Sequence, residues 1–161
     1  MQTFLPYPNF LQSAQCLDYR RLGKQRVECR QILQAIYFGN AWTSHPATIM
    51  WRGFEKALGL YWMTVCAEWE HRGYANYMGP EAERFVASIP GEAELPWWFG
   101  ESQFHRAHRS NLLRKDPIHY GKFGWTEHPG LPYLWPLPGG GYKDAKMGAG
   151  RAPVRLRKRR G

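Results

Sequence analysis

Large apolar residues recur at every third or fourth position between residues 51 and 69, which is the spacing of one face of a helix. These positions are Trp51, Phe54, Leu58, Tyr61, Trp62, Val65 and Trp69. Ser44-His45-Pro46 precedes them as a helix start, and Arg72 and Gly73 follow as an end. The pattern predicts one long helix whose aromatic stripe forms the hydrophobic core rather than a surface for stacking ligands.

A second helical stretch is predicted before this one. Either Asn9 or Ser13 is suited to cap its start, and the stretch continues to about Phe38. Gly39 is a typical residue after a helix end. Gly23 lies inside the stretch, so it marks either a break or a point of close packing.

Shorter helices are predicted at residues 80–89 and 102–115, and glycine and proline are dense from residue 125 onward. No segment alternates with the period of a strand. We therefore expect a compact, single-domain, all-α fold. The expected divisions are a helical domain at residues 1–128, a Pro/Gly-rich wrap at 129–150 and a disordered basic tail at 151–161.

The composition excludes several other classes of protein. With 161 residues, of which 43% are hydrophobic, the chain is suited to fold as one domain. No apolar run is long enough to span a membrane, and the first residues lack the pattern of a signal peptide. We expect a cytoplasmic monomer with three reduced cysteines, of which Cys29 is either buried or at the surface.

The net charge of +9 favours a polyanionic partner. Six of these charges lie in residues 151–161, which contain no acid, so residues 1–150 carry only +3. Within that part, basic residues concentrate in the segment 18–28, namely Arg20, Arg21, Lys24 and Arg26. A helix of this composition is suited to contact successive phosphates. The alternative is a solvated helix face with an internal pair between Lys24 and Glu28.

Residues 103–115 form a second basic segment with polar groups for phosphate or sugar. Its candidate nucleic-acid contacts are His105, His108, Arg109, Asn111 and Lys115. The spacing of His105 and His108 would suit two metal ligands. However, no acidic third ligand is near and neighbouring arginines repel a cation, so we expect no metal. Motifs for nucleotide cofactors and for serine nucleophiles are absent as well, so we expect no cofactor.

Several segments together resemble the pyrimidine-dimer DNA glycosylase family of the endonuclease V type, and in particular its actinobacterial branch. The segments are Thr3-Phe4-Leu5-Pro6, residues 17–28, His45-Pro46, residues 50–53 and residues 108–117. The resemblance implies an all-α protein that binds double-stranded DNA and flips a base out of the helix opposite the lesion. It also implies that the α-amine at the chain terminus attacks the sugar C1′ and forms a Schiff base, with a glutamate supporting glycosyl cleavage and strand scission. An α-amine ionises at about pH 7.7–8.0, so much of it is nucleophilic at neutral pH.

The resemblance places the family's glutamate on Arg21, its phosphate-contacting arginine on Arg20 and a DNA-contacting lysine on Lys115. We expect Met1 to be retained, because Gln2 is large, and its amine to be the candidate nucleophile. Glu28 is the preferred candidate carboxylate, because it lies in the same basic helix. The alternative for Glu28 is a simple ion pair with Lys24.

Three functional hypotheses follow from the resemblance and the residues. The first is a DNA glycosylase/AP lyase acting on a damaged or modified base through Met1 and Glu28. The second is a non-catalytic DNA-binding module of the same fold. The third is nucleotide or base chemistry that uses His105, His108 or His119.

Overall fold

A computed structural model describes residues 1–144 of the chain. The predicted basic tail, and the last residues of the predicted wrap, lie outside the described residues. The elements in chain order are α1 (Phe10–Cys16), α2 (Tyr19–Phe38), α3 (Pro46–Trp51), α4 (Glu55–His71), α5 (Gly79–Ser88), α6 (Ser102–Lys115), α7 (Pro117–Tyr120), the 3-10 helix η1 (Gly121–Phe123), and the strands β1 (Leu134–Pro136) and β2 (Tyr142–Asp144). The all-α fold class is confirmed.

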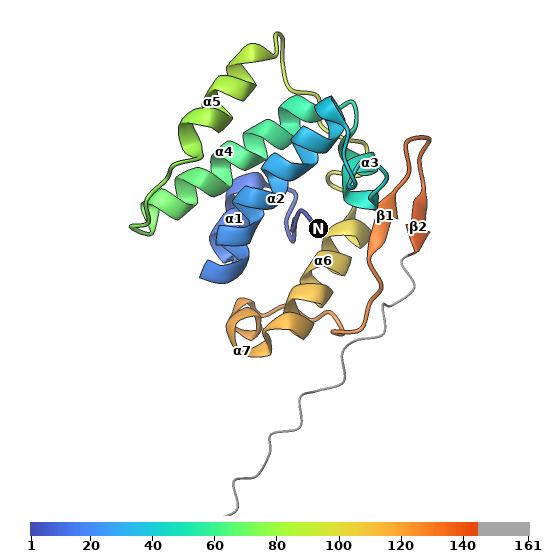
Figure 1. The fold of residues 1–161 in the computed structure, drawn as a ribbon. Coiled ribbons are helices and arrows are strands. Elements are labelled where there is room, and N and C mark those ends of the chain that lie inside the picture. Colours follow the sequence, from blue (N-terminus) through green and yellow to red (C-terminus); the bar gives the residue numbers. More distant parts are fainter. Residues whose placement is uncertain (145–161) are drawn as a thin grey trace, which may run out of the picture.

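The core forms where α4 packs against α2, α1 and α5 (Figure 1). Trp51, Tyr61 and Trp62 of the aromatic stripe are buried, which confirms the stripe as hydrophobic core. Gly23 is a point of close packing rather than a break, because a Cβ there would lie 3.0 Å from Cζ3 of Trp69. Figure 1 shows the N-terminus in the middle of the molecule, between α2 and α6.

Two predicted helices are each divided in two. The stripe belongs to α3 and α4, which are separated at Gly53, where φ is +85°. Only glycine adopts such a φ without strain, so the helix cannot continue through this residue. The first stretch divides at Leu17, and Asp18 starts α2 by accepting hydrogen bonds from the backbone N–H groups of Arg20 and Arg21.

The predicted wrap contains a short antiparallel hairpin in which Trp135 faces Lys143. Each strand has three residues, too few for an alternating pattern to be recognised in the sequence. The hairpin adds two strands to an otherwise helical fold. Its first strand packs against α3.

Candidate active site

A cavity of about 680 Å³ opens between the N-terminal arm, the first half of α2 and the junction of α6 with α7. It is lined by Met1, Gln2, Phe4, Asp18, Tyr19, Arg20, Arg21, Lys24, Glu28, Lys115, Asp116, His119 and Tyr133. The lining combines segments from both ends of the described chain. Its size falls within the usual range of about 300–1,000 Å³ for ligand sites.

The two predicted catalytic residues meet in this cavity. The α-amine nitrogen of Met1 lies 3.9 Å from Oε1 of Glu28, and Nζ of Lys24 lies 3.5 Å from the same oxygen. Glu28 is buried, whereas the side chain of Lys24 is 72% exposed. The alternative interpretation of Glu28 as a partner of Lys24 is therefore also present. The Glu28 carboxylate therefore lies within ion-pair distance of both the Met1 amine and Lys24.

The N-terminal arm, residues 1–5, is fixed along its length by buried side chains. Gln25 donates from Nε2 to the carbonyl of Gln2 and accepts from the backbone N–H of Phe4, at 2.9 and 2.8 Å. Trp51 donates its indole N–H to the hydroxyl of Thr3 at 2.9 Å. Chain termini are ordinarily poorly ordered unless they are held in this way. The arm is thus a defined part of the cavity.

His105 and His108 hold the next residue of the arm. Nδ1 of His108 accepts from the backbone N–H of Leu5 at 3.1 Å, and Nδ1 of His105 donates to the Leu5 carbonyl at 2.7 Å. Nε2 of His105 accepts from the N–H of Gly100, which fixes a neutral ring. Burial lowers the pKa of His108 to about 3, and burial also lowers the pKa of His105.

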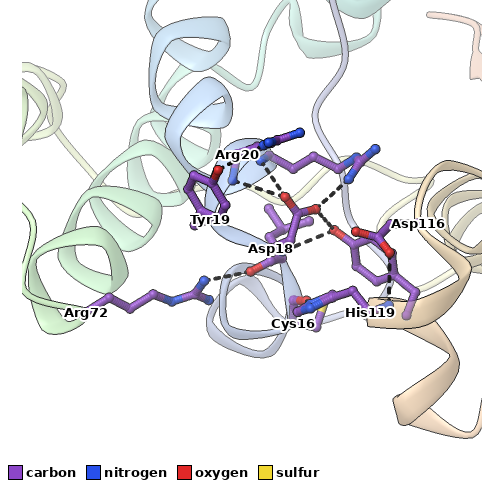
Figure 2. Close-up of polar contacts among 10 residues, drawn as sticks. Cys16, Asp18, Tyr19, Arg20, Arg72, Asp116 and His119 are labelled. Atoms are coloured by element: carbon purple, nitrogen blue, oxygen red, sulfur yellow. Dashed lines mark hydrogen bonds and ion pairs between the residues drawn. The ribbon is translucent and has the colours of Figure 1, made fainter. Parts of the chain in front are cut away.

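The predicted phosphate contacts at His105 and His108 do not fit this placement. Both rings are buried, and the nitrogens described above are occupied by the arm and its neighbours. Because both rings are buried, they also do not fit the third hypothesis, in which a histidine takes part in nucleotide or base chemistry. His119 differs, because it lines the cavity and its Nε2 lies 2.9 Å from the Cys16 carbonyl (Figure 2).

Asn111 and Arg109 also lie away from the cavity lining. Asn111 is buried and donates to the Ala107 carbonyl at 2.8 Å. Arg109 donates to the Pro6 carbonyl and lies 2.6 Å from a carboxylate oxygen of Glu127. The structure places both in internal contacts rather than on a DNA-binding surface. Helical spacing alone does not distinguish a face that another segment covers from one that solvent reaches.

Asp18 organises the rim of the cavity at the start of α2 (Figure 2). Its carboxylate accepts from Arg21 at 2.6 Å and from the hydroxyl of Tyr120 at 2.7 Å. Burial would raise the pKa of Asp18, but the hydrogen bonds from Arg21 and Tyr120 outweigh it and lower the pKa. Arg21 is therefore held in an ion pair, although it still lines the cavity.

Three of the predicted DNA contacts line the cavity and are exposed, namely Arg20, Lys24 and Lys115. Partial burial lowers the pKa of Lys115, and the nearby cations Arg21, Arg114 and Lys24 lower it further. This clustering of positive charge at one opening suits an anionic ligand.

Arg26 points to another part of the molecule. Its guanidinium lies 4.1 Å from the ring centroid of Trp69, between α2 and α4, and it is absent from the cavity lining. The predicted DNA contact at Arg26 does not fit this position, because two residues after Lys24 the helix turns a side chain toward its opposite face.

Gln25 and Tyr133 are residues of the site that the sequence did not single out. Gln25 is completely buried, and a buried glutamine inside a basic segment has no distinguishing pattern in one sequence. Tyr133 reaches the cavity from the Pro/Gly-rich segment, and burial raises its pKa to about 12. Both depend on tertiary contacts between segments far apart in the chain.

Within residues 1–144, no group of three His, Cys, Asp or Glu side chains is arranged to hold a metal ion. All three cysteines are free and buried, including Cys29. None of the helices that the structure describes has both the length and the apolar character needed to cross a membrane.

The sequence model of the pyrimidine dimer DNA glycosylase family matches residues 1–79. No curated protein and no solved structure gives a significant match to the chain. The matched region contains the N-terminal arm and all of α2, and therefore both Met1 and Glu28. Over residues 1–79, slightly less than half of its length, the chain is therefore similar to the pyrimidine dimer DNA glycosylase family.

Proposed function

We propose that the protein binds double-stranded DNA and acts as a DNA glycosylase/AP lyase on a damaged or modified base. One observation carries the proposal: the α-amine of Met1 and the carboxylate of Glu28 lie 3.9 Å apart in a cavity rimmed by exposed cations. The family match supports DNA repair as the setting. A nucleophile beside an acid–base group is the arrangement that covalent catalysis requires.

The reaction begins with the neutral amine of Met1. Its nitrogen bonds to C1′ of the damaged nucleotide, the bond from C1′ to the base breaks, and the base leaves with the electron pair and takes up a proton. The bond between C1′ and the ring oxygen O4′ then opens, O4′ takes up a proton, and an iminium joins the sugar to Met1. Glu28 is the group placed to accept the proton that the attacking nitrogen releases.

Strand scission follows from the same iminium. Removal of a proton from C2′ by the Glu28 carboxylate forms a C2′–C3′ double bond, and the C3′–O3′ bond breaks with departure of the phosphate. Water then hydrolyses the iminium and restores the amine. A ring-opened abasic sugar has no base to release. Its aldehyde condenses directly with the amine, which forms the same iminium and releases water.

Arg20, Lys24 and Lys115 have the role of phosphate contacts. They are exposed, they surround one opening, and they belong to two segments distant in the sequence. Contacts to phosphate fix the register of a duplex without reading its sequence. We assign the positioning of the DNA over the cavity to these three side chains.

Glu28 takes the place of the glutamate that the resemblance puts at Arg21. Seven residues separate the two positions, which is about two turns of helix, so both lie on the same face of α2. Arg21 is engaged with Asp18, and Glu28 is the acid that reaches the amine. Glu28 therefore offers a carboxylate on the same face of α2, two turns further along the helix.

Borohydride trapping tests the proposal. Duplexes that contain an abasic site or a pyrimidine dimer are incubated with the protein and sodium borohydride, and the adduct is located by peptide mass spectrometry. We expect a reduced cross-link at the Met1 α-amine that persists in Lys24→Arg and Lys115→Arg. Intact mass of the free protein reports whether Met1 is retained.

Two other outcomes contradict the proposed chemistry. A cross-link on a lysine alone would remove Met1 from the reaction. Absence of any adduct, together with retained binding to duplex DNA, would favour the non-catalytic DNA-binding module.

A further inference from the structure

We infer that Gln25 is the positioning residue that sets the N-terminal amine against Glu28, an inference that rests on the proposed function. Gln25 carries neither the nucleophile nor the carboxylate. Its carboxamide joins the strand-like arm that bears one to the helix that bears the other.

Gln25 hydrogen-bonds to two backbone groups of the arm, the carbonyl of Gln2 and the N–H of Phe4. Nε2 donates to the Gln2 carbonyl at 2.9 Å, and Oε1 accepts from the Phe4 N–H at 2.8 Å. Nε2 also lies 3.8 Å from Sγ of Cys29, one turn along α2. Both ends of the amide are thereby used, so its orientation is fixed and so is the arm's position against α2.

The other anchors of the arm come from other elements. Thr3 is held by Trp51 of α3, Phe4 by the hydroxyl of Tyr61 in α4, and Leu5 by the two histidines of α6. Gln25 is the anchor that belongs to α2, and it lies three residues before Glu28. Side chains three residues apart share one helix face, so the path from amine to carboxylate through Gln25 spans a single turn.

Burial strengthens the two hydrogen bonds between Gln25 and the arm. Gln25 is completely buried, so water does not compete for its two hydrogen bonds. Loss of them leaves the Gln2 carbonyl and the Phe4 N–H without these partners. Among the described residues, the anchors that remain come from α3, α4 and α6, and none of these side-chain hydrogen bonds joins the arm to the helix that bears Glu28.

The first test needs no DNA. The α-amine is reductively methylated with ¹³C-formaldehyde, and the NMR signal of its methyl groups is compared between variants. The wild-type signal should differ from that of Glu28→Gln, because a carboxylate lies 3.9 Å from the amine. We expect Gln25→Met, which has nearly the same volume but no amide, to shift the signal toward that of Glu28→Gln.

Tyr61→Phe is the matched control. It also removes one buried hydrogen bond to the arm, but it leaves the contact between the arm and α2. Its methyl signal should stay at the wild-type position. A Gln25→Met signal equal to the wild-type signal, or a Tyr61→Phe signal shifted equally, would overturn the inference.

A second test uses the trapping reaction under single-turnover conditions at saturating abasic DNA. Gln25→Met should lower the trapping rate about 10-fold or more while DNA affinity changes less than 2-fold. In the Glu28→Gln background the same substitution should have almost no further effect, because both act on one arrangement. Equal effects in the two backgrounds would show a merely structural role and refute the inference.

Failure of the proposed function remains distinguishable from failure of this inference. If the wild-type protein forms no adduct, the proposed reaction fails, and the methyl signal still decides whether Gln25 sets the amine. If Gln25→Met does not fold, Gln25→Glu replaces it. A protonated glutamic acid makes both hydrogen bonds and an ionised one does not, so its signal should return to the wild-type position only at acidic pH.

Discussion

At the scale of single residues, the carboxylate of Glu28 is the group on which the proposed reaction depends most. It is buried and lies within 4 Å of two cations, the Met1 amine and Lys24. Such an acid is able both to orient the amine and to take its proton. In the proposed reaction, the basic residues around it position the DNA at this point.

Glu28→Gln should lower the rate of base release and strand scission by about 10²–10⁴-fold, which is the usual contribution of a general acid–base group. DNA affinity should not fall, because the amide keeps the volume and removes a negative charge that repels phosphate. The measurement is single-turnover cleavage beside an electrophoretic binding assay. Glu81→Gln, which breaks an ion pair with Arg30 in another part of the molecule, is the control. Unchanged turnover in Glu28→Gln would remove this residue from the mechanism.

The two catalytic candidates came from different sources: the resemblance implies the terminal amine of Met1, and the basic motif points to Glu28. The structure brings them within 3.9 Å of each other, and their catalytic roles stay predictions. His105 and Asn111 were misplaced for a reason that is also local. They share a helix with arginines, and the sequence of that helix does not show that the N-terminal arm and the segment after residue 125 cover this face.

At the scale of elements, the close contact between α2 and α4 explains the glycine in the middle of α2. Trp69 lies over Gly23, and the ring is held there by the guanidinium of Arg26, by stacking on Tyr74 and by an N–H bond to the Ala75 carbonyl. The ring therefore has little freedom to move away from a new methyl group.

Gly23→Ala should destabilise the protein by about 1–3 kcal/mol through overpacking. Helix propensity alone would predict a gain of about 1 kcal/mol, so the two effects have opposite signs. Denaturant unfolding measures the difference. Gly121→Ala is the control, because no atom lies within 4 Å of its added Cβ. If the Gly23→Ala protein is more stable than the wild type, the Trp69 ring must move to accommodate the new methyl group.

His108, which is buried and hydrogen-bonded to the N-terminal arm, makes the stability of the protein depend on pH. The pKa of His108 is lowered to about 3 in the folded state, against about 6.5 for an unperturbed histidine. Between these values the unfolded chain binds more protons, so folding stability rises with pH through this range and is complete above about 6.5. It falls as the pH falls from 6.5 toward 3.

His108→Asn should flatten this dependence between pH 4.5 and 6.5. Each buried neutral histidine contributes up to about 1.4 kcal/mol per pH unit there, and the asparagine oxygen still accepts from the Leu5 N–H. The free energy of unfolding is measured for both proteins at the same pH values in this range, so that the titration of the carboxylates, which both share, cancels in the difference. His71→Asn, at an exposed histidine, should keep the wild-type slope. Equal slopes for His108→Asn and the wild type would contradict the assignment.

Element boundaries show where sequence patterns stop being informative. Residues 102–115 were predicted as a helix with the limits that the structure has, because Pro117 and the change of composition mark its end. The break at Gly53 was missed, because the aromatic stripe keeps nearly the same spacing on both sides of it. A stripe reports which side chains are buried, and a single residue with positive φ redirects the backbone without disturbing it.

At the scale of the whole molecule, the cavity joins the beginning of the chain to residues 115–133. The family match ends at residue 79, so Lys115, Asp116, His119 and Tyr133 belong to a region that it does not cover. Met1 and Glu28 lie in the matched region. The opposite wall comes from the part of the chain outside the match.

Exposed cations on both walls should make DNA binding strongly dependent on salt. Lys24→Ala and Lys115→Ala should each weaken affinity for all sequences alike and reduce the slope of log K against log salt by about 0.9. Arg84→Ala, at an exposed residue of α5 outside the cavity lining, should leave the slope unchanged. Unchanged slopes in both lysine variants would place the DNA elsewhere.

The position of the amine at the front of a fixed arm has a practical consequence for anyone who prepares the protein. An extended chain advances about 3.3–3.6 Å per residue, so a single residue left before Met1 by an affinity tag would carry the amine away from Glu28 by nearly its present distance. We expect such a protein to keep its fold and DNA affinity and to lose the proposed reaction of the amine. A tag that is removed without a scar, or placed at the other end, keeps the amine where the proposed reaction needs it.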